Sequence, residues 1–543
     1  MKFIRLGMMT SKKNYKVLND CRQMYEDEVF EAILKRRGIA DPEHFFNPTE
    51  DDLLPLGSLL RINDAFKRVD KAIKENEKIS VLFDTDLDGT SSGAIITRYL
   101  RNFTNNIVTY IDEGKQHGLI GQDIEKFRDS NLLIIVDSLD KDESQYKKLH
   151  ESGTDVIILD HHSIKETVPY DEYSILVSSQ REYSNPQLSG AGVTWKFCKY
   201  MDEQYLTDYA DELADLAACG LVGDMMDMTV MENRYIVSKG LSKIYNPAIK
   251  KIVGGFEFNS TAISFSVAPI VNASNRIGKN DIAMKAFIED DNKTLLKYMR
   301  ELKKCKELQN EEVDNILPGA IQSCEEQKNK KMMVVFIETD YGISGLLGNK
   351  LLEKYKRPIL VLKDCSDTYR GSMRAIGVED FRKICNESGL AKAEGHELAS
   401  GFEIKKELLE EFELYIEKNL PELRDNSVTS VDIQLDISDI TRKMVDLIKR
   451  FDRISGTNFQ PVKVYIDNIY DYEIGNMSDY KHLTIKPNDY LLIIKWNFNG
   501  SFDEMEDHSL FNDELKVVGT IDSGFLGRKF VLKVVCDEIE EVG

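Results

Sequence analysis

The stretch 81-VLFDTDLDGTSSGA-94 decides the fold of this chain and shows where its chemistry lies. An apolar run ends in Asp84, Asp86 and Asp88 at alternate positions, and a glycine and small hydroxyl residues follow. Three negative charges in one tight turn repel one another unless a positive charge lies among them. The stretch therefore predicts a strand that ends at a calcium loop, at a magnesium or manganese site, or at a plain polar turn.

A calcium loop of the EF-hand type does not fit. That loop needs a glutamate at its twelfth position to bind the ion with both oxygens, and the residue there is Ile95. A strand also enters this turn, where an EF-hand has a helix. A magnesium or manganese site and a polar turn remain as alternatives.

Length and composition place the chain among globular proteins with about two to four domains, since it has 543 residues, 42% of them hydrophobic and 30% charged. No apolar run reaches the roughly 20 residues that cross a bilayer, and the start MKFIRLGMMTSKK lacks the apolar core of a secretory signal. Eight cysteines without a CxxC pair indicate reduced thiols in a cytoplasmic protein, with neither a disulfide framework nor a zinc site.

The net charge of −22 excludes a surface coated with basic residues for duplex DNA. It is compatible with nucleic acid held in a narrow channel that is basic only locally. Residues 501–543 are acidic, with eleven Asp or Glu against four Lys or Arg. We interpret this tail as a solubilising surface, with a partner-binding element as the alternative.

Short apolar runs after residue 78 indicate an α/β fold with a parallel sheet. Runs of four to six apolar residues without alternation are typical of strands buried on both faces, and helical stretches between them suit parallel crossovers. The predicted strands are ISVLF (79–83), IVTYI (107–111), LLIIV (132–136), DVIIL (155–159) and YSILVS (173–178). Residues 1–75 have a mostly helical pattern.

Later segments predict a connecting helix, a second α/β block and a β-rich end. Residues 292–328 are charged and periodic, which indicates one long helix or two that meet near Pro318. Strands over 332–338 and 358–362 begin the second α/β block. After about residue 428, alternating apolar and polar residues predict a small antiparallel barrel or sandwich.

Acidic and imidazole side chains follow several of the apolar runs. LLIIV leads into Asp137, DVIIL leads into 160-DHH-162, and 216-LAACGLVG-223, interpreted as another strand, leads into Asp224. The carboxyl ends of parallel strands meet at one edge of a sheet, where ligands bind. A lone aspartate after a strand often caps a helix instead, and a His pair is more often structural than a ligand. The set as a whole, with the three aspartates of the opening stretch, favours a metal site.

The residue types at this edge indicate which metals suit it. Mostly carboxylate ligands with one or two imidazoles suit Mn²⁺ or Mg²⁺ better than zinc. Several carboxylates around a shared oxygen can hold two ions about 3.5–4 Å apart, an arrangement that activates water and clamps phosphoryl oxygens.

Motifs along nearly the whole chain follow the order found in a known family. The matching segments are 36-RRGI-39, 70-DKAI-73, 84-DTDLDG-89, Asp137, 160-DHH-162, 188-LSGAGVTWKF-197, 223-GDMMDM-228, 233-NR-234, 269-PIVNASNRIG-278, 371-GSMR-374, 395-GHELASG-401 and 456-GTNFQP-461. In these segments the chain resembles the DHH phosphoesterases and, among them, the RecJ family of single-strand-specific 5′→3′ DNA exonucleases. Any one motif is weak, whereas the ordered set is specific.

The resemblance implies four consecutive parts. They are N-terminal helices with a parallel-sheet DHH catalytic domain over 1–285, a connecting helix over 286–328, a smaller α/β domain called DHHA1 over 329–428, and an OB-like nucleic-acid-binding barrel with the acidic tail over 429–543. It also implies a cytoplasmic, monomeric enzyme that acts without a membrane.

The activity implied is metal-dependent hydrolysis of single-stranded DNA from a 5′ end, which releases 5′-mononucleotides in repair, recombination or replication. Two Mn²⁺ or Mg²⁺ ions would be held by Asp84, Asp86, Asp88, Asp137, His161 and Asp224. Asp137 would bridge the ions, Asp160 would orient a histidine, and His162 would polarise the scissile phosphate or donate to it. The ions activate the attacking water, so no separate general base is needed.

Further residues would bind the strand. The candidates for backbone phosphates are Asn272, Arg276, Gly371, Ser372, Arg374, Gly395 and His396. Tyr465, Tyr470 and Trp496 are candidates for base stacking, with packing inside the barrel as the favoured alternative. A single-strand-binding protein or a helicase is an expected partner.

Four departures from the family pattern stand out. They are Leu87 for a small residue, Ser138-Leu139 for Cys-Gly, Asn275 for a glycine and Glu394 for a glycine. None removes a predicted metal ligand, but Glu394 places phosphate affinity or substrate choice in question.

Two other functions remain as alternatives. One is a DHH phosphodiesterase for short oligonucleotides, cyclic dinucleotides or pyrophosphate, which would not need a β-rich third domain. The other is a nuclease-inactive replication scaffold, and the intact aspartates and His161 argue against it.

Overall fold

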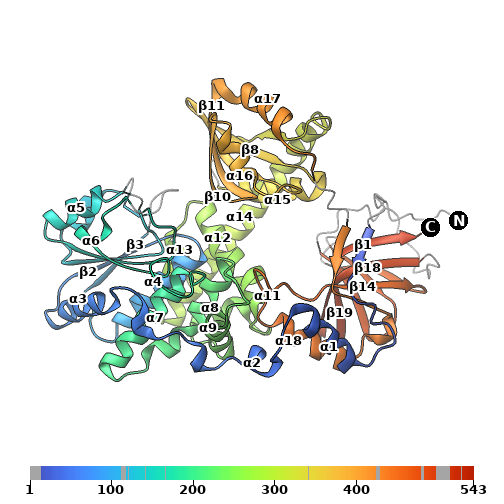
Figure 1. The fold of residues 1–543 in the computed structure, drawn as a ribbon, viewed down its shortest axis with the longest axis horizontal. Helices are drawn as coiled ribbons and strands as arrows, with labels where there is room; N and C mark the ends of the chain where they lie inside the picture. The colour runs from blue at the N-terminus through green and yellow to red at the C-terminus, as the bar shows by residue number, and fades with distance from the viewer. Residues whose placement is uncertain are drawn as a thin grey trace.

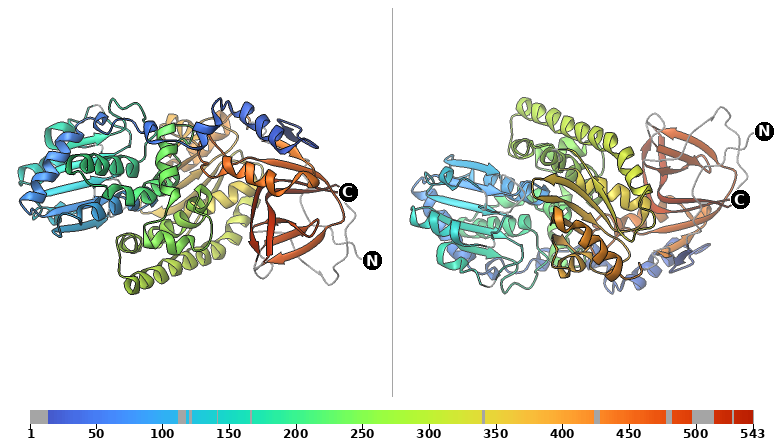
Figure 2. Two further views of the ribbon diagram at one scale, coloured as in Figure 1. Left: turned by 90° about the horizontal axis from the view of Figure 1, so that it is seen from below. Right: turned by 90° about the horizontal axis from the view of Figure 1, so that it is seen from above.

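Elements of the chain gather around three larger sheets, with helices between the resulting lobes (Figure 1). In this computed structural model the described residues are 14–111, 118–119, 122–140, 142–165, 167–339, 342–423, 428–477, 482–496, 514–526 and 529–542. The first and last lobes lie at opposite ends of the long axis in both further views (Figure 2).

The first lobe contains a five-stranded parallel sheet with the order β3-β2-β4-β5-β6. Its strands are β2 (Ile79–Phe83), β3 (Ile107–Ile111), β4 (Leu132–Val136), β5 (Asp155–Asp160) and β6 (Ile175–Ser178). Every residue of β2 and β4 is buried, as expected for apolar runs that have helices on both faces. The predicted fold class, α/β with a parallel sheet, is confirmed.

Helices cover this sheet on both sides (Figure 1). Alternate strand residues such as Val81 and Ile134 face the larger core, and their neighbours Leu82 and Leu133 face a smaller one. The helices of the larger core include α3 (Ile62–Lys74), α4 (Leu87–Leu100) and α7 (Gly190–Tyr205), and those of the smaller core are α5 (Ser144–Glu151) and α6 (Tyr170–Tyr173).

A group of helices connects the first lobe to the others. They are α8 (Ala214–Gly223), α9 (Met231–Ser242), α10 (Pro247–Val253), α11 (Ser260–Ala262), α12 (Ala268–Arg276) and α13 (Asp281–Phe287). The charged, periodic stretch that follows forms one helix of 34 residues, α14 (Asn292–Glu325), with Pro318 inside it. Its end packs against the first strand of the second sheet.

The second lobe has a five-stranded sheet with the order β10-β11-β9-β8-β7. Its elements are β7 (Met333–Phe336), α15 (Ser344–Tyr355), β8 (Ile359–Cys365), β9 (Thr368–Arg374), α16 (Phe381–Glu387), β10 (Ala391–His396), β11 (Ala399–Lys405) and α17 (Leu409–Asn419). Only β7 and β8 pair in parallel, and the other pairs in the described part of this sheet are antiparallel.

The third lobe is β-rich, as predicted. Its seven-stranded sheet has the order β13-β14-β18-β19-β17-β16-β15. The strands are β13 (Ile433–Leu435), β14 (Val464–Ile469), β15 (Glu473–Met477), β16 (His482–Lys486), β17 (Leu491–Lys495), β18 (Glu514–Leu526) and β19 (Lys529–Val542). Among the described residues no pairing joins β13 to β15, so closure into a barrel is not seen there.

The N-terminal segment lies beside this third lobe (Figure 1). Strand β1 (Asn14–Val17) pairs in parallel with β12 (Val428–Val431), and helix α1 (Glu26–Arg37) packs against α18 (Arg442–Asp452). The short helix α2 (Pro42–Phe46) follows on the way back to α3. The N-terminal helices that the sequence groups with the catalytic sheet are therefore divided, since α1 packs against C-terminal elements and α3 packs against β6 and α7.

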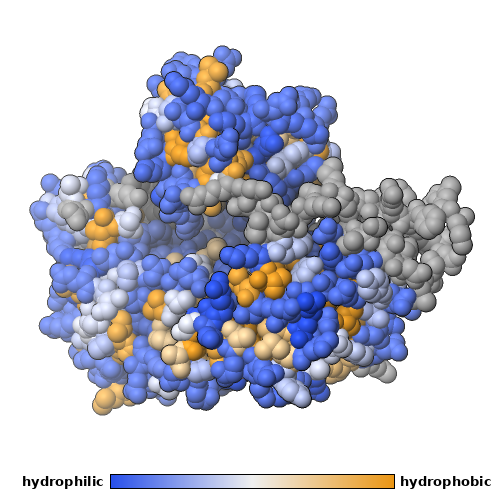
Figure 3. Space-filling model, turned by 45° about the vertical axis from the view of Figure 1, so that its right-hand side comes forward, coloured by the Kyte–Doolittle hydropathy of each residue, from blue (hydrophilic) through white to orange (hydrophobic). Residues whose placement is uncertain are grey.

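The visible surface is largely hydrophilic and is hollowed where the second lobe stands over the other two (Figure 3). No helix in the described part of the chain combines the length and apolar character needed to span a membrane.

Candidate metal centre and phosphate-binding residues

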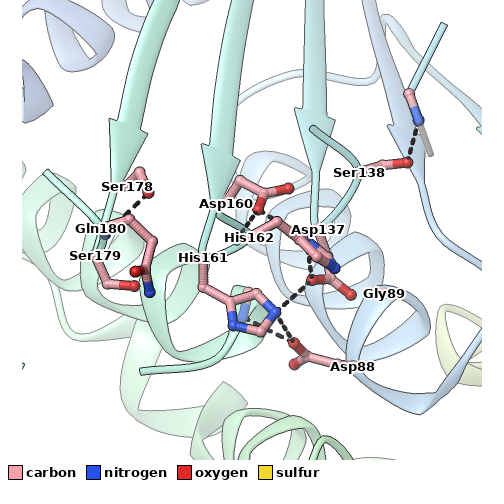
Figure 4. A network of polar contacts seen from close by, with 12 residues as sticks. Asp88, Gly89, Asp137, Ser138, Asp160, His161, His162, Ser178, Ser179 and Gln180 are labelled. Carbon is pink, nitrogen blue, oxygen red and sulfur yellow. Dashed lines mark hydrogen bonds and ion pairs between the residues drawn. The ribbon is translucent and has the colours of Figure 1, made fainter. Parts of the chain in front are cut away.

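Three adjacent strands of the first sheet bring the predicted metal ligands to one edge. Asp84 follows β2, Asp137 follows β4, and Asp160 is the last residue of β5. Because β2, β4 and β5 are neighbours, these ends lie side by side. Below them the close view shows a cluster made of Asp88, Asp137, Asp160, His161 and His162 (Figure 4).

The His161 imidazole is the centre of this cluster. Its Nε2 atom lies 3.1 Å from Oδ1 of Asp137 and 3.4 Å from Oδ2 of Asp224. The same nitrogen lies 3.6 Å from Oδ2 of Asp88. One nitrogen is thus surrounded by carboxylates that come from three distant parts of the sequence.

The segment before Asp224 is a helix, and its interpretation as a strand is wrong. Residues 216–223 lie in α8, and Asp224 is its C-cap. Residues Leu216 to Val222 are all buried, so the helix is apolar on every side and shows no period in its sequence. The C-terminal end of α8 nevertheless places Asp224 at the edge of the sheet where the strands β2, β4 and β5 end.

The Asp88 carboxylate is held by the start of α7. Its oxygens accept hydrogen bonds from Ser189 Oγ at 2.9 Å, from the Gly190 amide at 2.8 Å and from the Ala191 amide at 3.0 Å. Helix N-termini carry free amides and a partial positive charge, which suits a buried carboxylate. No motif assigned this role in advance, although Ser189 before two glycines is a helix N-cap pattern.

The Asp160 carboxylate fixes the orientation of the His162 ring. The ring nitrogen Nδ1 of His162 lies 2.9 Å from Oδ1 of Asp160, and that oxygen also accepts a hydrogen bond from the His162 amide at 2.5 Å. Burial alone would lower the pKa of His162, but the Asp160 carboxylate outweighs it and raises that pKa to about 9. The pKa of Asp160 is held below its usual range because His162 offsets the burial of the carboxylate.

Asp137 has a strained backbone. Its φ of 53° lies in the left-handed region, which residues other than glycine seldom adopt. The peptide amide of Asp137 donates to the Leu159 carbonyl at 3.0 Å, so β5 holds the turn in place. In this backbone conformation the Asp137 carboxylate lies beside His161 at the point where β4 ends.

Three glycines fit closely against aspartates of this edge. A Cβ atom on Gly190 would lie 2.5 Å from Oδ1 of Asp137, and one on Gly220 would lie 2.2 Å from Oδ1 of Asp88. A Cβ on Gly89 would lie 2.4 Å from the Asp84 carbonyl oxygen. The site therefore requires glycine at these positions for lack of space.

Replacing Gly220 by alanine is expected to weaken Mn²⁺ binding by about 10–100-fold, since the new methyl group would lie 2.2 Å from Asp88 Oδ1 and 2.3 Å from Ala191 Cβ and so displaces the carboxylate and the start of α7. The matched control is Gly319→Ala, a helical glycine in α14 where an added Cβ meets no atom within 4 Å. The control should bind Mn²⁺ unchanged and gain up to about 1 kcal/mol of stability. Equal affinity of both variants in a Mn²⁺ titration would contradict the steric argument.

Burial and mutual repulsion raise the pKa of most carboxyl groups at this edge. Desolvation is the largest cause, and neighbouring carboxylates add to it, which raises the pKa of Asp86 to about 7 and that of Asp224 to about 8. The same causes raise the pKa of Asp137 well above its usual range. Without a cation, the folded chain resists ionisation of these groups.

The donor set fits divalent ions that prefer oxygen. Three groups have ligand atoms within 4.8 Å of one another, and they are Asp84 with Asp86 and Asp137, Asp88 with His161 and Asp224, and Asp137 with His161 and His162. Asp137 belongs to two of the groups and so lies between them. Carboxylates with few imidazoles are the ligand type of Mn²⁺ and Mg²⁺.

Helix α12 carries the predicted phosphate ligands Asn272 and Arg276 next to the metal edge. Asn275, between them, donates to Thr85 Oγ1 at 2.5 Å, and Thr85 follows the first aspartate of the opening stretch. The side-chain oxygen of Asn272 is buried and has no hydrogen-bond partner in the part of the chain that the structure describes. Asn275, which replaces a glycine of the family pattern, thus joins α12 to the turn of aspartates.

Positive charge is concentrated between α12 and the second sheet. Burial lowers the pKa of Arg276, and the nearby Arg374 guanidinium lowers it further. Burial and Arg276 likewise lower the pKa of Lys306 on α14, a residue that no motif singled out. Ser372 lies beside Arg374 on β9, and its Oγ is 2.8 Å from Ser344 Oγ at the start of α15. Such a group of cations and hydroxyls suits phosphate oxygens.

The remaining predicted phosphate ligands lie elsewhere on the second sheet. Gly371 has a packing reason to be glycine, since a Cβ there would lie 1.9 Å from the Val361 carbonyl oxygen. Gly395 has a φ of 130°, and His396 is exposed at the end of β10, two strands from Arg374. Glu394 is exposed and pairs with Lys392 at 3.0 Å, so its charge is partly offset.

The three candidate stacking residues differ in exposure. Tyr465 is buried and packs against Tyr15 with ring centroids 5.3 Å apart, so its surface is already covered. Tyr470 and Trp496 are 47% and 44% exposed. Trp496 stands edge-on to His482 at 4.7 Å.

The sequence is similar to single-strand DNA exonucleases of known families. Residues 78–221 match the family described as DHH family, N-terminal domain. The chain is 30% identical over 436 residues to YorK of Bacillus subtilis (strain 168), which is named provisionally as an SPbeta prophage-derived single-strand DNA-specific exonuclease. That match covers 73% of this chain and 74% of YorK. RecJ of the same organism, a single-stranded-DNA-specific exonuclease, is 27% identical over 459 residues, which are 78% of this chain and 57% of RecJ.

The fold is similar to that of RecJ from Thermus thermophilus. The crystal structure of that protein in complex with Mn²⁺ matches with a TM-score of 0.76 at 20% identity, over 98% of this chain and 80% of the other. Its complex with Mg²⁺ matches with a TM-score of 0.68 at 19% identity, over 98% and 79% of the two chains. The likeness extends over all three lobes described above.

Proposed function

Because this chain belongs to the RecJ-like family of DHH exonucleases, we propose that it hydrolyses single-stranded DNA from the 5′ end and releases 5′-mononucleotides. The reaction would use two divalent ions, Mn²⁺ or Mg²⁺. The observation that carries the proposal is the convergence of Asp88, Asp137 and Asp224 on Nε2 of His161, within 3.1–3.6 Å. Burying several carboxylates is energetically unfavourable unless they bind a cation, and a scaffold without nuclease activity would not need such a cluster.

Two sets of ligands support a two-metal centre. Asp84 and Asp86 would hold one ion, His161 with Asp88 and Asp224 would hold the other, and Asp137 would contribute to both. When bound, such ions polarise a phosphoryl oxygen and lower the pKa of the attacking water. The start of α7 orients the Asp88 carboxylate through its three hydrogen bonds.

His162 would act on the substrate phosphate. Its pKa of about 9 keeps the imidazole protonated at neutral pH, and Asp160 occupies its Nδ1 nitrogen. The other nitrogen, Nε2, is then a charged donor for a non-bridging phosphate oxygen or for the departing oxygen. Asp160 is the positioning residue of this pair.

Recognition of the 5′ end would rest on the cations beside the metal edge. Arg276 lies on the same helix as Asn275, whose side chain contacts the turn of aspartates. The Arg276 guanidinium donates a hydrogen bond to Gln309 at 3.2 Å. Arg374 donates to Asn349 at 2.7 Å, so both guanidinium groups are oriented before substrate arrives. We infer that Arg276, Ser372 and Arg374 hold phosphates near the 5′ end, with Asn272 beside them. Trp496 and Tyr470 remain candidates for stacking farther along the strand.

Digestion of end-labelled oligonucleotides tests the function. A 5′-labelled single strand should release labelled mononucleotide at once in Mn²⁺ or Mg²⁺, a 3′-labelled strand should shorten progressively, and chelator should stop both reactions. Single-stranded RNA, duplex DNA and dinucleotides are the comparison substrates. Preference for dinucleotides would favour a short-oligonucleotide phosphodiesterase, and no cleavage of any substrate would favour a scaffold. Adding a single-strand-binding protein or a helicase tests for those partners.

The stabilisation by Mn²⁺ is expected to grow between pH 6 and pH 8.5. Without metal, Asp86 and Asp224 have folded pKa values of about 7 and 8, above their unfolded values near 3.9. The folded chain then holds protons that the unfolded chain has lost, so metal-free stability falls as pH rises through this range. Bound ions remove that loss because they pair with the ionised carboxylates.

The measurement is the difference in melting temperature between Mn²⁺ and chelator at several pH values. We expect this difference to correspond to about 1–3 kcal/mol more at pH 8.5 than at pH 6. Asp452, whose pKa burial raises to about 7, titrates in the same range but outside the site, so it affects both conditions equally. A difference that is constant with pH would contradict the assignment of these ligands.

A further inference from the structure

The loop that carries Asp224 is shaped by a turn from the C-terminal part of the chain. The loop runs from the end of α8 to the start of α9, over residues 224–230. The turn is 455–460, between α18 and β14, and it belongs to the 456-GTNFQP-461 segment that has no role in the proposed reaction. We propose that Asn458 in this turn is a positioning residue that acts on Asp224 through Asp227. This proposal rests on the metal-binding role proposed for Asp224.

The helix end at Asp224 is strained. The Met226 amide donates to the Leu221 carbonyl at 3.0 Å and the Met225 amide to the Val222 carbonyl at 3.2 Å, which is a Schellman motif. This motif needs a left-handed residue after the C-cap, and that residue is Met225, with a φ of 56°, in place of the usual glycine. The left-handed conformation is unfavourable for a residue with a side chain. The loop therefore needs contacts from outside to keep this shape.

Those contacts come from the turn at 455–460. The Met228 amide donates to the Thr457 carbonyl at 3.0 Å, within an isolated β-bridge between Asp227 and Thr457. The Asn458 side-chain amide donates to Asp227 Oδ2 at 2.7 Å. A Cβ on Gly456 would lie 2.8 Å from the Met228 side chain, so the two segments are in close contact.

Asp227 connects the turn to the rest of its own loop by hydrogen bonds. Its Oδ1 accepts hydrogen bonds from the Thr229 amide at 2.8 Å and from the Thr229 hydroxyl at 2.6 Å. Its carbonyl accepts one from Asn233 at 3.0 Å. One carboxylate thus joins the turn through Oδ2 and the loop through Oδ1, three residues after Asp224.

The turn itself is fixed. Phe459 is buried, with its ring 5.1 Å from the Phe45 ring and 5.0 Å from the Arg234 guanidinium. Arg234 donates to the Met228 carbonyl at 3.1 Å and to the Ile454 carbonyl at 3.3 Å, so it joins the loop to the turn a second time. A fixed turn can hold a strained loop, whereas a mobile one could not.

Asn458→Gly removes the bond to Asp227 and little else. Asn458 has a φ of 59°, which glycine adopts readily, and its side chain is exposed. Asn468→Gly is the matched control, because Asn468 is also exposed, has a φ of 54° and donates to an aspartate, Asp467, at 3.1 Å. Asp227→Asn is a second test, since its single amide oxygen can accept from Asn458 or from Thr229 but not from both.

The test is Mn²⁺ binding to the full chain, followed by electron paramagnetic resonance of the free ion, together with the Mn²⁺ dependence of exonuclease activity. Asn458→Gly should bind Mn²⁺ about tenfold more weakly and need about tenfold more for half-maximal activity. Its rate at saturating Mn²⁺ should stay within about twofold of the unchanged protein. Asn468→Gly should resemble the unchanged protein in both readouts, whereas Asp227→Asn should bind Mn²⁺ more weakly.

Unchanged Mn²⁺ binding in Asn458→Gly would overturn the proposal. A rate that falls equally at limiting and saturating Mn²⁺ would also overturn it, because such a result indicates a general structural role. A protein that binds Mn²⁺ with this dependence on Asn458 but cleaves no DNA would contradict the proposed function alone. A protein that binds no Mn²⁺ at all would contradict both.

Discussion

Asp137→Asn is expected to lower exonuclease turnover by about 10³-fold or more at saturating Mn²⁺, because the carboxylate that we propose to contact both ions would supply several kcal/mol of charge stabilisation through them. Asparagine is the informative replacement here. It has nearly the same shape, and it tolerates the left-handed backbone at this position, where φ is 53°. The measurement is release of mononucleotide from 5′-labelled single-stranded DNA over a range of Mn²⁺ concentrations.

The same variant should be more stable than the unchanged protein in chelator. Burial and four neighbouring carboxylates raise the pKa of Asp137, so a neutral amide relieves repulsion in the metal-free fold. The melting temperature in chelator should rise, and the gain on adding Mn²⁺ should shrink. Activity above a tenth of the original, or a lower melting temperature in chelator, would contradict the role given to Asp137.

Lys196→Met is expected to destabilise the first lobe by about 3–5 kcal/mol, because it leaves the buried Glu232 carboxylate without its cation. The Lys196 ammonium lies 2.6 Å from Glu232 Oε1, and the side chains are 0% and 2% exposed. Tyr183 and Asn185 also donate to this carboxylate, at 2.7 and 2.9 Å, but they are neutral and cannot offset its charge. The urea midpoint of unfolding measures the effect.

The control for this prediction lies one turn along the same helix. Lys199 pairs with Asp211 at 3.0 Å, and the Asp211 side chain is 38% exposed. Lys199→Met should cost less than about 1 kcal/mol, since Lys239 still pairs with Asp211 at 2.9 Å and water screens that carboxylate. Similar midpoints for the two variants would show that burial of the Lys196 pair does not matter.

Strands were the most predictable part of this fold. The apolar runs at 79–83 and 132–136 coincide with β2 and β4, because a strand covered by helices on both faces is made mostly of apolar residues. The run at 107–111 coincides with β3, an edge strand whose residues are partly exposed. The same logic failed for 216–223, since a helix buried on all sides is also an uninterrupted apolar run. The length of the run did not distinguish a buried helix from a buried strand, because the run has only eight residues.

The predicted metal ligands came together for a reason visible in the sequence. Parallel strands place their carboxyl ends at one edge, and Asp137 and the DHH segment follow two of them. The residues that hold those ligands were not predictable in this way. Ser189 and Gly190 meet Asp88 from a segment about a hundred residues away, and such contacts have no local signature.

Tyr465 shows a second limit of sequence reasoning. For an aromatic residue in a β-rich segment the sequence favours core packing over base stacking without deciding between them, and the contact with Tyr15 from the N-terminal strand shows that Tyr465 is packed. Gly371 is similar, because its neighbour Val361 on the adjacent strand explains the glycine without any ligand. In both cases the deciding residue lies outside the local motif.

The pairing of β1 with β12 has a consequence for how the chain folds during synthesis. Asn14 pairs with Val428, so the earliest described strand waits for its partner until the first two lobes have left the ribosome. At about 5–20 residues per second, this wait is roughly 20–80 s. For that time the apolar face of α1, with Val29, Phe30, Ile33 and Leu34, has no α18 to cover it. The third lobe is thus completed by residues made long before it, and the growing chain must keep those residues from aggregating until β12 and α18 appear.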